Sequence, residues 1–331
     1  MKDLFLRRWF LALLLAGLGL ALVVPDWLRP WIERLEVRAV VAVALFLMAW
    51  SLDSRSLFSS FLRPLPVFWA VMISYGLVPA LGWSAGWLLA SPDLRIGLLI
   101  IASVPCTLAS AVLWTRLAGG KEATALLVIL VTTATSWLGT TAWLTLGSGT
   151  EVTLSVTSLM QDLALVLVLP VALGQICRAV RPMAQAATRH RRLLDGISRL
   201  FILAIILKAA VAVRDKLAEN SASLTVASLL LTLVLCLGIH LAALSGGFWS
   251  SRLLGCDRPT RIAIAFAGSQ KTLPVGLYLF DVYFVNTFPL AVIPIAFYHI
   301  GQLVVDTLIA EKLAETPAGH RGTPQTSALP E

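Results

Sequence analysis

The chain has 331 residues, of which 58% are hydrophobic and only 13% are charged. A soluble domain has about a quarter of its residues charged, and the mean hydropathy of +0.85 is too apolar for one soluble core. The net charge of +8 could serve nucleic-acid binding, but an excess of basic residues in cytoplasmic loops explains it more simply. The composition therefore excludes an ordinary soluble protein and predicts an all-α polytopic membrane protein in contact with the lipid bilayer and without a nucleic-acid partner.

The apolar segments are close to the roughly 20 residues that a helix needs to cross a bilayer. In chain order, the ten predicted spans are 6–25, 36–52, 66–91, 96–116, 122–147, 153–177, 196–213, 222–249, 262–281 and 287–310. The first is predicted to be an anchor helix, because no small-x-small cleavage site precedes Pro25. The seventh contains Lys208, which can snorkel from a helix end. The tail 316–331 is expected to be disordered.

Lysines and arginines orient the predicted spans. With the N-terminus in the cytoplasm, most basic residues fall on the cytoplasmic side, including the cluster between Arg178 and Arg199. That cluster could bind lipid headgroups or nucleic acid, but as a central cytoplasmic loop it is more simply a topology signal. Ten spans then place both termini in the cytoplasm. We expect a multi-pass plasma-membrane protein, in the inner membrane if the source is bacterial.

The short segment "GSGTEVT" divides the predicted spans into five and five. Because each half has an odd number of spans, the second half must be inverted in the membrane, which is a common frame of secondary transporters. The prediction is a first five-helix repeat at 1–147 and a second, inverted repeat at 153–315, followed by the cytoplasmic tail 316–331.

The fourth span of each half is interrupted by small polar residues and proline. The two interruptions read "SVPCTLASAV", with Pro105, Thr107 and Ser110, and "GSQKTLPVGL", with Ser269, Gln270, Lys271, Thr272 and Pro274. Proline leaves backbone groups unpaired, and a membrane tolerates this only inside protein or beside a wet cavity. These prolines could merely kink packed helices. Two such breaks at equivalent positions instead favour a binding site of broken helices.

Lys271 strengthens this interpretation, because a lysine near mid-bilayer costs about 2.5–3.5 kcal/mol even on insertion scales and needs a partner or a cavity. The sequence leaves Asp162 and Asp306 open as partners. An ammonium group and half-helix N-termini would attract a small organic anion. His299 and Asp306, two helical turns apart, are candidates for a proton relay. The chain shows no pattern typical of an intramembrane enzyme, and its scattered cysteines and histidines predict neither a disulfide framework nor a metal site.

Four stretches resemble the bile acid:sodium symporter family, and most closely its sodium/bile acid cotransporter-like subgroup of uncertain substrate. They are "LFLMAWSLDSRSLFSSFLRP", "SVPCTLASAVLWTRLAGGKEATAL", "GSQKTLPVGL" and "FYHIGQLVVDTLIAEKL". The resemblance covers essentially the whole chain. It implies a panel of spans one, two, six and seven that moves against a core of spans three to five and eight to ten, with spans four and nine crossing as broken helices.

The resemblance also implies positions for an ion site. Sodium-coupled members carry a Ser-Asn pair where this chain has Ser110 and Ala111, and a glutamine that aligns with Ser74. Their Thr or Ser pair of span five best matches Thr132 with one of Thr133, Thr135 or Ser136.

In span nine the sodium-coupled members have a glutamate followed four residues later by Gln-Asn. Here these positions are Phe266, Gln270 and Lys271. A sodium site needs oxygen ligands, and an ammonium group repels the ion. We therefore expect no cofactor and no intact sodium site, and predict a transporter that works as a uniporter or with protons. A non-transporting regulator or sensor on the same fold and a genuinely sodium-coupled symporter are the alternatives.

Overall fold

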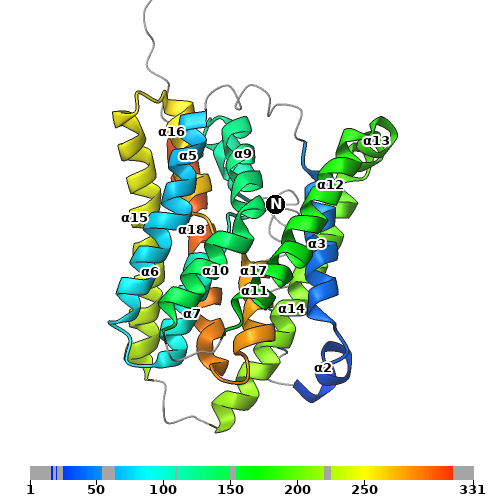
Figure 1. Ribbon diagram of the computed structural model, residues 1–331, viewed down its shortest axis with the longest axis vertical. Coiled ribbons are helices and arrows are strands. Elements are labelled where there is room, and N and C mark those ends of the chain that lie inside the picture. Colours follow the sequence, from blue (N-terminus) through cyan, green and yellow to red (C-terminus); the bar gives the residue numbers. More distant parts are fainter. Residues whose placement is uncertain are drawn as a thin grey trace, which may run out of the picture.

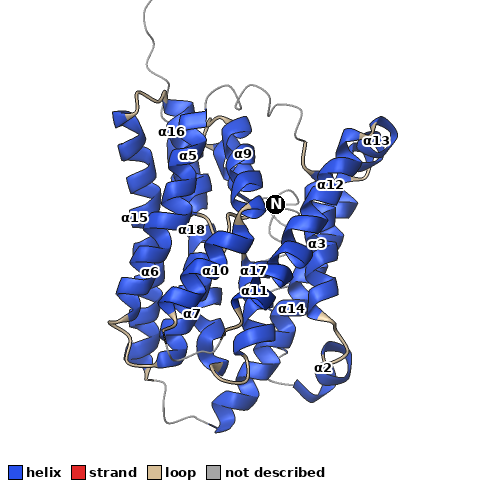
Figure 2. Cartoon of the chain, in the orientation of Figure 1, coloured by secondary structure: helices blue, strands red, loops and turns tan. Residues whose placement is uncertain are grey.

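The structure is a computed structural model that describes residues 16, 17, 20, 25–53, 64–108, 110–149, 154–219 and 225–315, with the backbone alone for 25, 212–219 and 315. The described residues form helices and connecting loops and contain no strand (Figure 2), so the predicted all-α class is confirmed. The first predicted span, apart from a few residues, and the tail 316–331 lie outside the described residues.

Most of the helices lie within the predicted spans, several of them in pieces, whereas Pro25–Ile32 and Arg181–Arg189 are helices in predicted loops. In the first half they are α2 (Pro25–Ile32), α3 (Val37–Ser51), α5 (Pro64–Met72), α6 (Val78–Gly86), α7 (Pro92–Ser103), α8 (Ser110–Leu117), α9 (Glu122–Ala134) and α10 (Ser136–Gly147). In the second half they are α11 (Val156–Leu163), α12 (Leu169–Ala179), α13 (Arg181–Arg189), α14 (Arg191–Glu219), α15 (Val226–Leu253), α16 (Arg258–Ser269), α17 (Leu273–Leu279) and α18 (Val292–Glu315). The π-helical turns η2 (Ile73–Leu77), η3 (Ala164–Val168) and η4 (Phe280–Phe284) continue α5, α11 and α17, and the 3-10 turn η5 (Pro289–Ala291) precedes α18.

Local sequence signals explain where these helices begin. The Asp257 side chain accepts a hydrogen bond from the Thr260 backbone N–H at 3.1 Å and caps α16. Thr225 and Ser228 form a reciprocal capping box at the start of α15, which satisfies backbone donors that have no partner inside the helix. Pro274 is the second residue of α17. It therefore begins a half-helix at a position where proline's missing N–H costs nothing, and the interruption itself lies just before it, at 270–272 within the predicted stretch.

The described helices form two groups that meet along α11 and α17. On one side α3 packs against α12 and α14, and on the other α15 packs against α16 and α18 (Figure 1). Two ion pairs tie α3 and α14 to neighbouring elements. One joins α14 to η4, and the other joins α3 to α11. Lys208 Nζ of α14 lies 3.4 Å from Asp281 Oδ2, and Arg38 Nη2 of α3 lies 3.0 Å from Asp162 Oδ2. Lys208 is thus paired with a carboxylate, whereas the sequence predicted that it snorkels.

Four described helices are long and apolar enough to cross a membrane: Pro64–Gly86, Val156–Ala179, Val226–Leu253 and Pro289–Ala314. A fifth span is possible if α9 and α10, bent by 61°, are taken together. The ten-span inverted repeat is therefore not confirmed and stays a prediction. One physical reason is that the predicted fourth and ninth spans are each divided into two helices that are individually too short to cross a bilayer.

Gly97 of α7 lies directly against the backbone of η5. A Cβ atom at this position would overlap the carbonyl group of Ala291, and overpacking of this kind costs about 1–3 kcal/mol. We therefore expect Gly97→Ala to lower the melting temperature of the purified protein by several degrees. Gly238→Ala is the matched control, because nothing lies within 4 Å of a Cβ there and alanine favours a helix. Equal melting temperatures for the two variants would contradict the close approach of α7 and η5.

Candidate functional site

Two interrupted helices meet at the centre of the candidate site. In the first, α7 ends at Ser103 and α8 begins at Ser110; in the second, α16 ends at Ser269 and α17 begins at Leu273. The Thr272 backbone N–H donates a hydrogen bond to the Pro105 carbonyl at 3.1 Å, which joins the two breaks directly. Backbone groups freed by one interruption are thus partly satisfied by the other, as a water-poor interior requires.

Lys271 lies in the second break with its side chain fully buried. Its ammonium nitrogen donates to the Ser74 carbonyl at 2.5 Å, to Ser74 Oγ at 3.2 Å and to the Val104 carbonyl at 3.0 Å. The nitrogen also lies 5.5 Å from the centroid of the Tyr75 ring, within the distance of a cation–π interaction. The ammonium group is therefore surrounded by oxygen atoms and an aromatic face.

The local sequence explains why these two carbonyls are available. In the π-helical turn Ile73–Leu77 the Val78 N–H bonds to Ile73 O instead of Ser74 O. The next residue along is Pro79, which has no N–H to donate. Val104 is the residue that follows the last turn of α7, where carbonyl groups lack partners inside the helix. The chain thus presents two free backbone oxygens, and Lys271 occupies the point between them.

No acidic side chain among the described residues pairs with Lys271, so both carboxylates that the sequence left open are wrong as partners. Asp162 instead accepts a hydrogen bond from Tyr283 at 2.6 Å and pairs with Arg38. Asp306 contacts His240 and Gln270. The lysine side chain is thus held by backbone and hydroxyl oxygens and by an aromatic face, with no carboxylate in direct contact with its nitrogen among the described residues.

Gln270 connects the second break to its surroundings. Its Oε1 accepts a hydrogen bond from Ser110 Oγ at 2.9 Å, and its Nε2 donates to Asp306 Oδ2 at 2.5 Å. Because an ionised carboxylate accepts only, this pairing fixes which end of the amide faces Ser110. The predicted residues Ser110, Gln270 and Asp306 therefore form one hydrogen-bonded chain between α8, the second break and α18.

Of the remaining predicted site residues, Thr132 contacts the first break, whereas the printed hydrogen bond of Ser136 and Thr133 joins them to each other. Thr132 Oγ1 of α9 accepts a hydrogen bond from the Cys106 N–H at 3.4 Å, and Ser136 Oγ donates to the Thr133 carbonyl at 2.7 Å. Thr107 lies buried in the first break, and Ala111 is buried in the first turn of α8. Phe266 is packed against Leu244, Ile262, Ala310 and other apolar residues, so no carboxylate or other oxygen ligand stands at that position.

His299 does not contact Asp306 in the structure. Its Nδ1 lies 2.9 Å from Gln302 Nε2, and Gln302 in turn makes two hydrogen bonds of 2.9 Å with the backbone of Lys271. The histidine beside Asp306 is His240, at 2.8 Å. Sequence reasoning missed His240, Gln302 and Tyr75. A signal for His240 was present, because an ionisable residue near the middle of an apolar 28-residue helix is a candidate for function.

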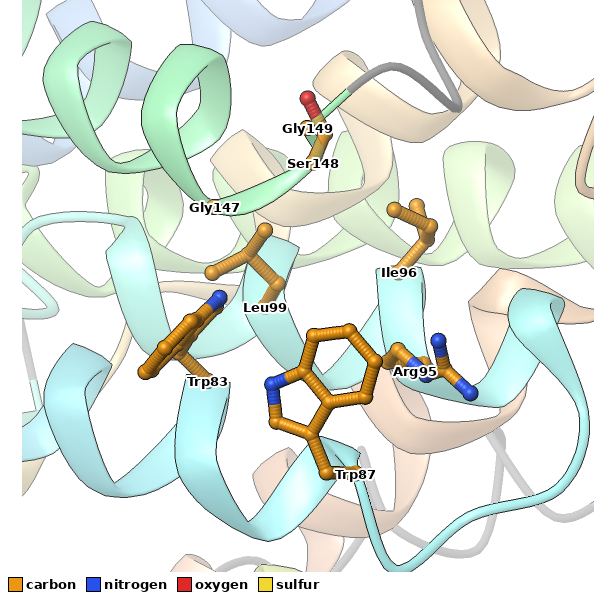
Figure 3. A pocket seen from close by; sticks show the side chains of 8 residues that line it. All are labelled: Trp83, Trp87, Arg95, Ile96, Leu99, Gly147, Ser148 and Gly149. Atoms are coloured by element: carbon orange, nitrogen blue, oxygen red, sulfur yellow. The ribbon is translucent and has the colours of Figure 1, made fainter.

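A separate pocket lies at the ends of α6, α7 and α10. It is lined by Trp83, Trp87, Arg95, Ile96, Leu99 and Gly147–Gly149 (Figure 3). The Arg95 guanidinium lies over the Trp87 ring, 4.6 Å from its centroid. None of these residues belongs to either break, and aromatic residues with arginine are typical of helix ends at a membrane interface. We therefore do not assign the candidate functional site to this pocket.

The comparisons with known proteins agree with the expected resemblance. The model of the SBF-like CPA transporter family matches residues 8–315. The chain is similar to sodium/bile acid cotransporter 7 of Danio rerio, with 26% identity over 234 residues, or 69% of this chain and 67% of that protein. It is 24% identical to the Mus musculus protein of the same name over 320 residues, which is 92% of this chain and 91% of that protein. It is 25% identical to the putative symporter YfeH of Escherichia coli over 297 residues, which is 86% of this chain and 85% of that protein.

The match to the family model extends over nearly the whole chain and includes both interrupted helices. The apolar helices of the structure are consistent with a protein of the membrane. The protein therefore belongs to the SBF-like CPA transporter family, a family of membrane transporters related to the bile acid:sodium symporters.

Proposed function

We propose that this protein is a secondary transporter that moves a small organic anion across the membrane by alternating access, without a sodium site. The observation that carries this proposal is the buried Lys271 ammonium at the junction of two interrupted helices. A buried charge in a membrane protein is costly and is retained at substrate and ion pathways. The lysine makes the junction positive, which favours an anionic substrate.

The arrangement of Lys271 also argues against sodium. Carbonyl oxygens freed by broken helices are the ligands that sodium uses in transporters, and here they receive an ammonium group instead. A second cation at the same oxygens would be repelled by several kcal/mol at low effective dielectric constant. The ammonium thus replaces the ion, and transport proceeds as uniport or with protons. No enzymatic step is part of the proposal.

Sodium coupling is the second candidate, because two of the relatives reported above are named sodium/bile acid cotransporters. Against it stand Lys271 in the oxygen cluster and Phe266 in an apolar environment. The two candidates differ in one measurable property, the response of uptake to a sodium gradient.

For the architecture we propose two inverted five-helix repeats, at 1–147 and 153–315, with both termini in the cytoplasm. Spans one, two, six and seven form a panel that moves against a core of spans three to five and eight to ten. The packing of α3 against α12 and α14, apart from α15, α16 and α18, supports this division. In this scheme the ion pair of Lys208 with Asp281 joins the panel to the core, whereas the ion pair of Arg38 with Asp162 lies within the panel.

The experiment has two stages. Purified protein is first screened for thermal stabilisation by a bile salt, a monocarboxylate and a dicarboxylate, and the stabilising anions are then tested for uptake into proteoliposomes with and without an inward sodium gradient. We expect saturable uptake that is the same in both conditions, because the ammonium occupies the oxygens that sodium would need. Uptake that requires the sodium gradient would favour the second candidate. Binding without uptake would favour a regulator or sensor on this fold.

A further inference from the structure

The buried residue His240 lies between two oxygen atoms. Its Nε2 is 2.8 Å from Asp306 Oδ1 on α18, and its Nδ1 is 3.4 Å from the Ser269 carbonyl oxygen at the end of α16. His240 and Asp306 are both fully buried. The same Ser269 carbonyl also accepts a hydrogen bond from Tyr298 at 3.0 Å, and a carbonyl oxygen can never donate.

These partners match one protonation state of the ring better than the other. A neutral imidazole has one N–H donor and one acceptor nitrogen, whereas the imidazolium has two donors. With a proton on both nitrogens, each N–H of His240 faces an oxygen acceptor. With the ring neutral and Nε2–H bound to the Asp306 carboxylate, the lone pair of Nδ1 faces the lone pairs of the Ser269 carbonyl. The site is therefore complete only when an additional proton is bound.

The pair is connected to the transport site by hydrogen bonds. The second Asp306 oxygen accepts from Gln270, and Gln270 accepts from Ser110, which is only partly buried. Ser269 is the last residue of α16 before the second break. A proton on Nδ1 of His240 would therefore join α15 to the end of the interrupted helix, and its loss would weaken that contact next to Lys271.

The other ionisable groups around His240 are few. The side chain of Tyr298 on α18 lies edge-on to the imidazole, with ring centroids 5.8 Å apart. On α15 itself Cys236 lies one turn away and bonds to the Pro294 carbonyl. Arg261 of α16 bonds to the Phe248 carbonyl of α15, two turns further along. On the α5–α6 side, Tyr75 is the one titratable residue of Pro64–Gly86, and it bonds to the Thr132 carbonyl.

We propose that His240 and Asp306 form a proton-binding site, and that the proton bound there is the coupling ion of transport. This inference rests on the proposed transport function. The proton is taken from water on one side of the membrane, forms the Nδ1–H bond of His240, and returns to water on the other side. Together with Lys271 it gives the joined breaks one more positive charge while the anion is bound. A monovalent anion and one proton would thus cross together without net charge transfer.

The first test measures the proton and needs no substrate. The chain has four histidines, so the wild type labelled with ¹⁵N-histidine in lipid nanodiscs gives a tractable NMR spectrum. Across a pH series we expect His240, assigned by its absence in His240→Gln, to show a state with protons on both ring nitrogens. In Asp306→Asn that state should be absent. A His240 ring that remains neutral over the whole range in the wild type overturns the proposal.

The second test measures coupling in proteoliposomes with the anion found in the screen above. For the wild type we expect uptake to be several-fold faster with an inward proton gradient than at equal pH, and the ratio to fall to about one in His240→Gln and in Asp306→Asn. His190→Gln is the matched control, because this histidine is exposed at the end of α13 and should keep the wild-type ratio.

The two proposals fail in different ways. Wild-type uptake that does not depend on the proton gradient contradicts the proposed coupling site but not the proposed anion transport. An absence of uptake for every anion contradicts the transport function, and with it proton coupling, even if the NMR titration shows that His240 binds a proton. Variants are compared only when they elute as monodisperse protein, and the use of two independent substitutions protects the test against misfolding of either one.

Discussion

Replacing Lys271 by methionine should reduce the affinity for the anionic substrate by ten- to a hundredfold. Two unit charges about 8 Å apart attract by about 2 kcal/mol at an effective dielectric constant of about 20, which corresponds to roughly a thirtyfold change in affinity. Methionine keeps much of the side-chain volume and removes the charge. The measurement is the dissociation constant from ligand-induced thermal stabilisation, together with the concentration dependence of uptake.

Two further variants separate the charge from its hydrogen bonds. Lys271→Gln keeps N–H donors for the carbonyls of Ser74 and Val104 but carries no charge. It should therefore lose affinity for the anion as Lys271→Met does, but unfold at a higher temperature than Lys271→Met. Lys312→Met removes a lysine from the exposed end of α18 and should bind like the wild type. Wild-type affinity in Lys271→Gln would show that the charge does not attract the substrate.

Asp306→Ala should be strongly destabilising. The aspartate is fully buried and accepts hydrogen bonds from both His240 and Gln270, so alanine leaves two buried polar groups without their acceptor. Removing one member of a buried charge pair costs about 3–5 kcal/mol. We expect a melting temperature lower by many degrees, measured on purified protein in the same detergent as the wild type.

Glu311→Ala provides the control for this substitution. Glu311 is exposed on the same helix, where replacement of an acidic residue changes stability by about 0.5 kcal/mol or less. If Asp306→Ala melted at the same temperature as Glu311→Ala, the hydrogen-bonded chain from His240 to Ser110 would not contribute to stability. The role of Asp306 in organising the site would then be contradicted.

Much of the candidate site could be predicted because its residues break strong local rules. Polar residues and prolines interrupt apolar segments at Pro105 and Pro274, and Lys271 is an ionisable residue in the middle of one of them. Such departures are visible in the sequence without any knowledge of contacts. Two of the four stretches that carry the family resemblance contain these interruptions.

The partners within the site could not be predicted, because residues far apart in the sequence supply them. Lys271 was expected to meet Asp162 or Asp306, but it donates to carbonyls of Ser74 and Val104. Backbone oxygens leave no trace in side-chain patterns, and whether one is free depends on the local helix type and on what packs against it. For the same reason Asp306 was assigned to His299 on its own helix, whereas its partner His240 comes from α15.

The sequence by itself determined the membrane class, the positions of the helix interruptions and the presence of a buried cation, because these follow from local hydropathy and from the missing N–H of proline. Only the tertiary structure decided what the interruptions face. The hydrogen bond between Thr272 and Pro105, the oxygens around Lys271 and the His240–Asp306 pair all depend on how α7, α15, α16 and α18 pack together. In a lipid-embedded protein that packing must satisfy every exposed backbone group internally, and this requirement places one break against the other.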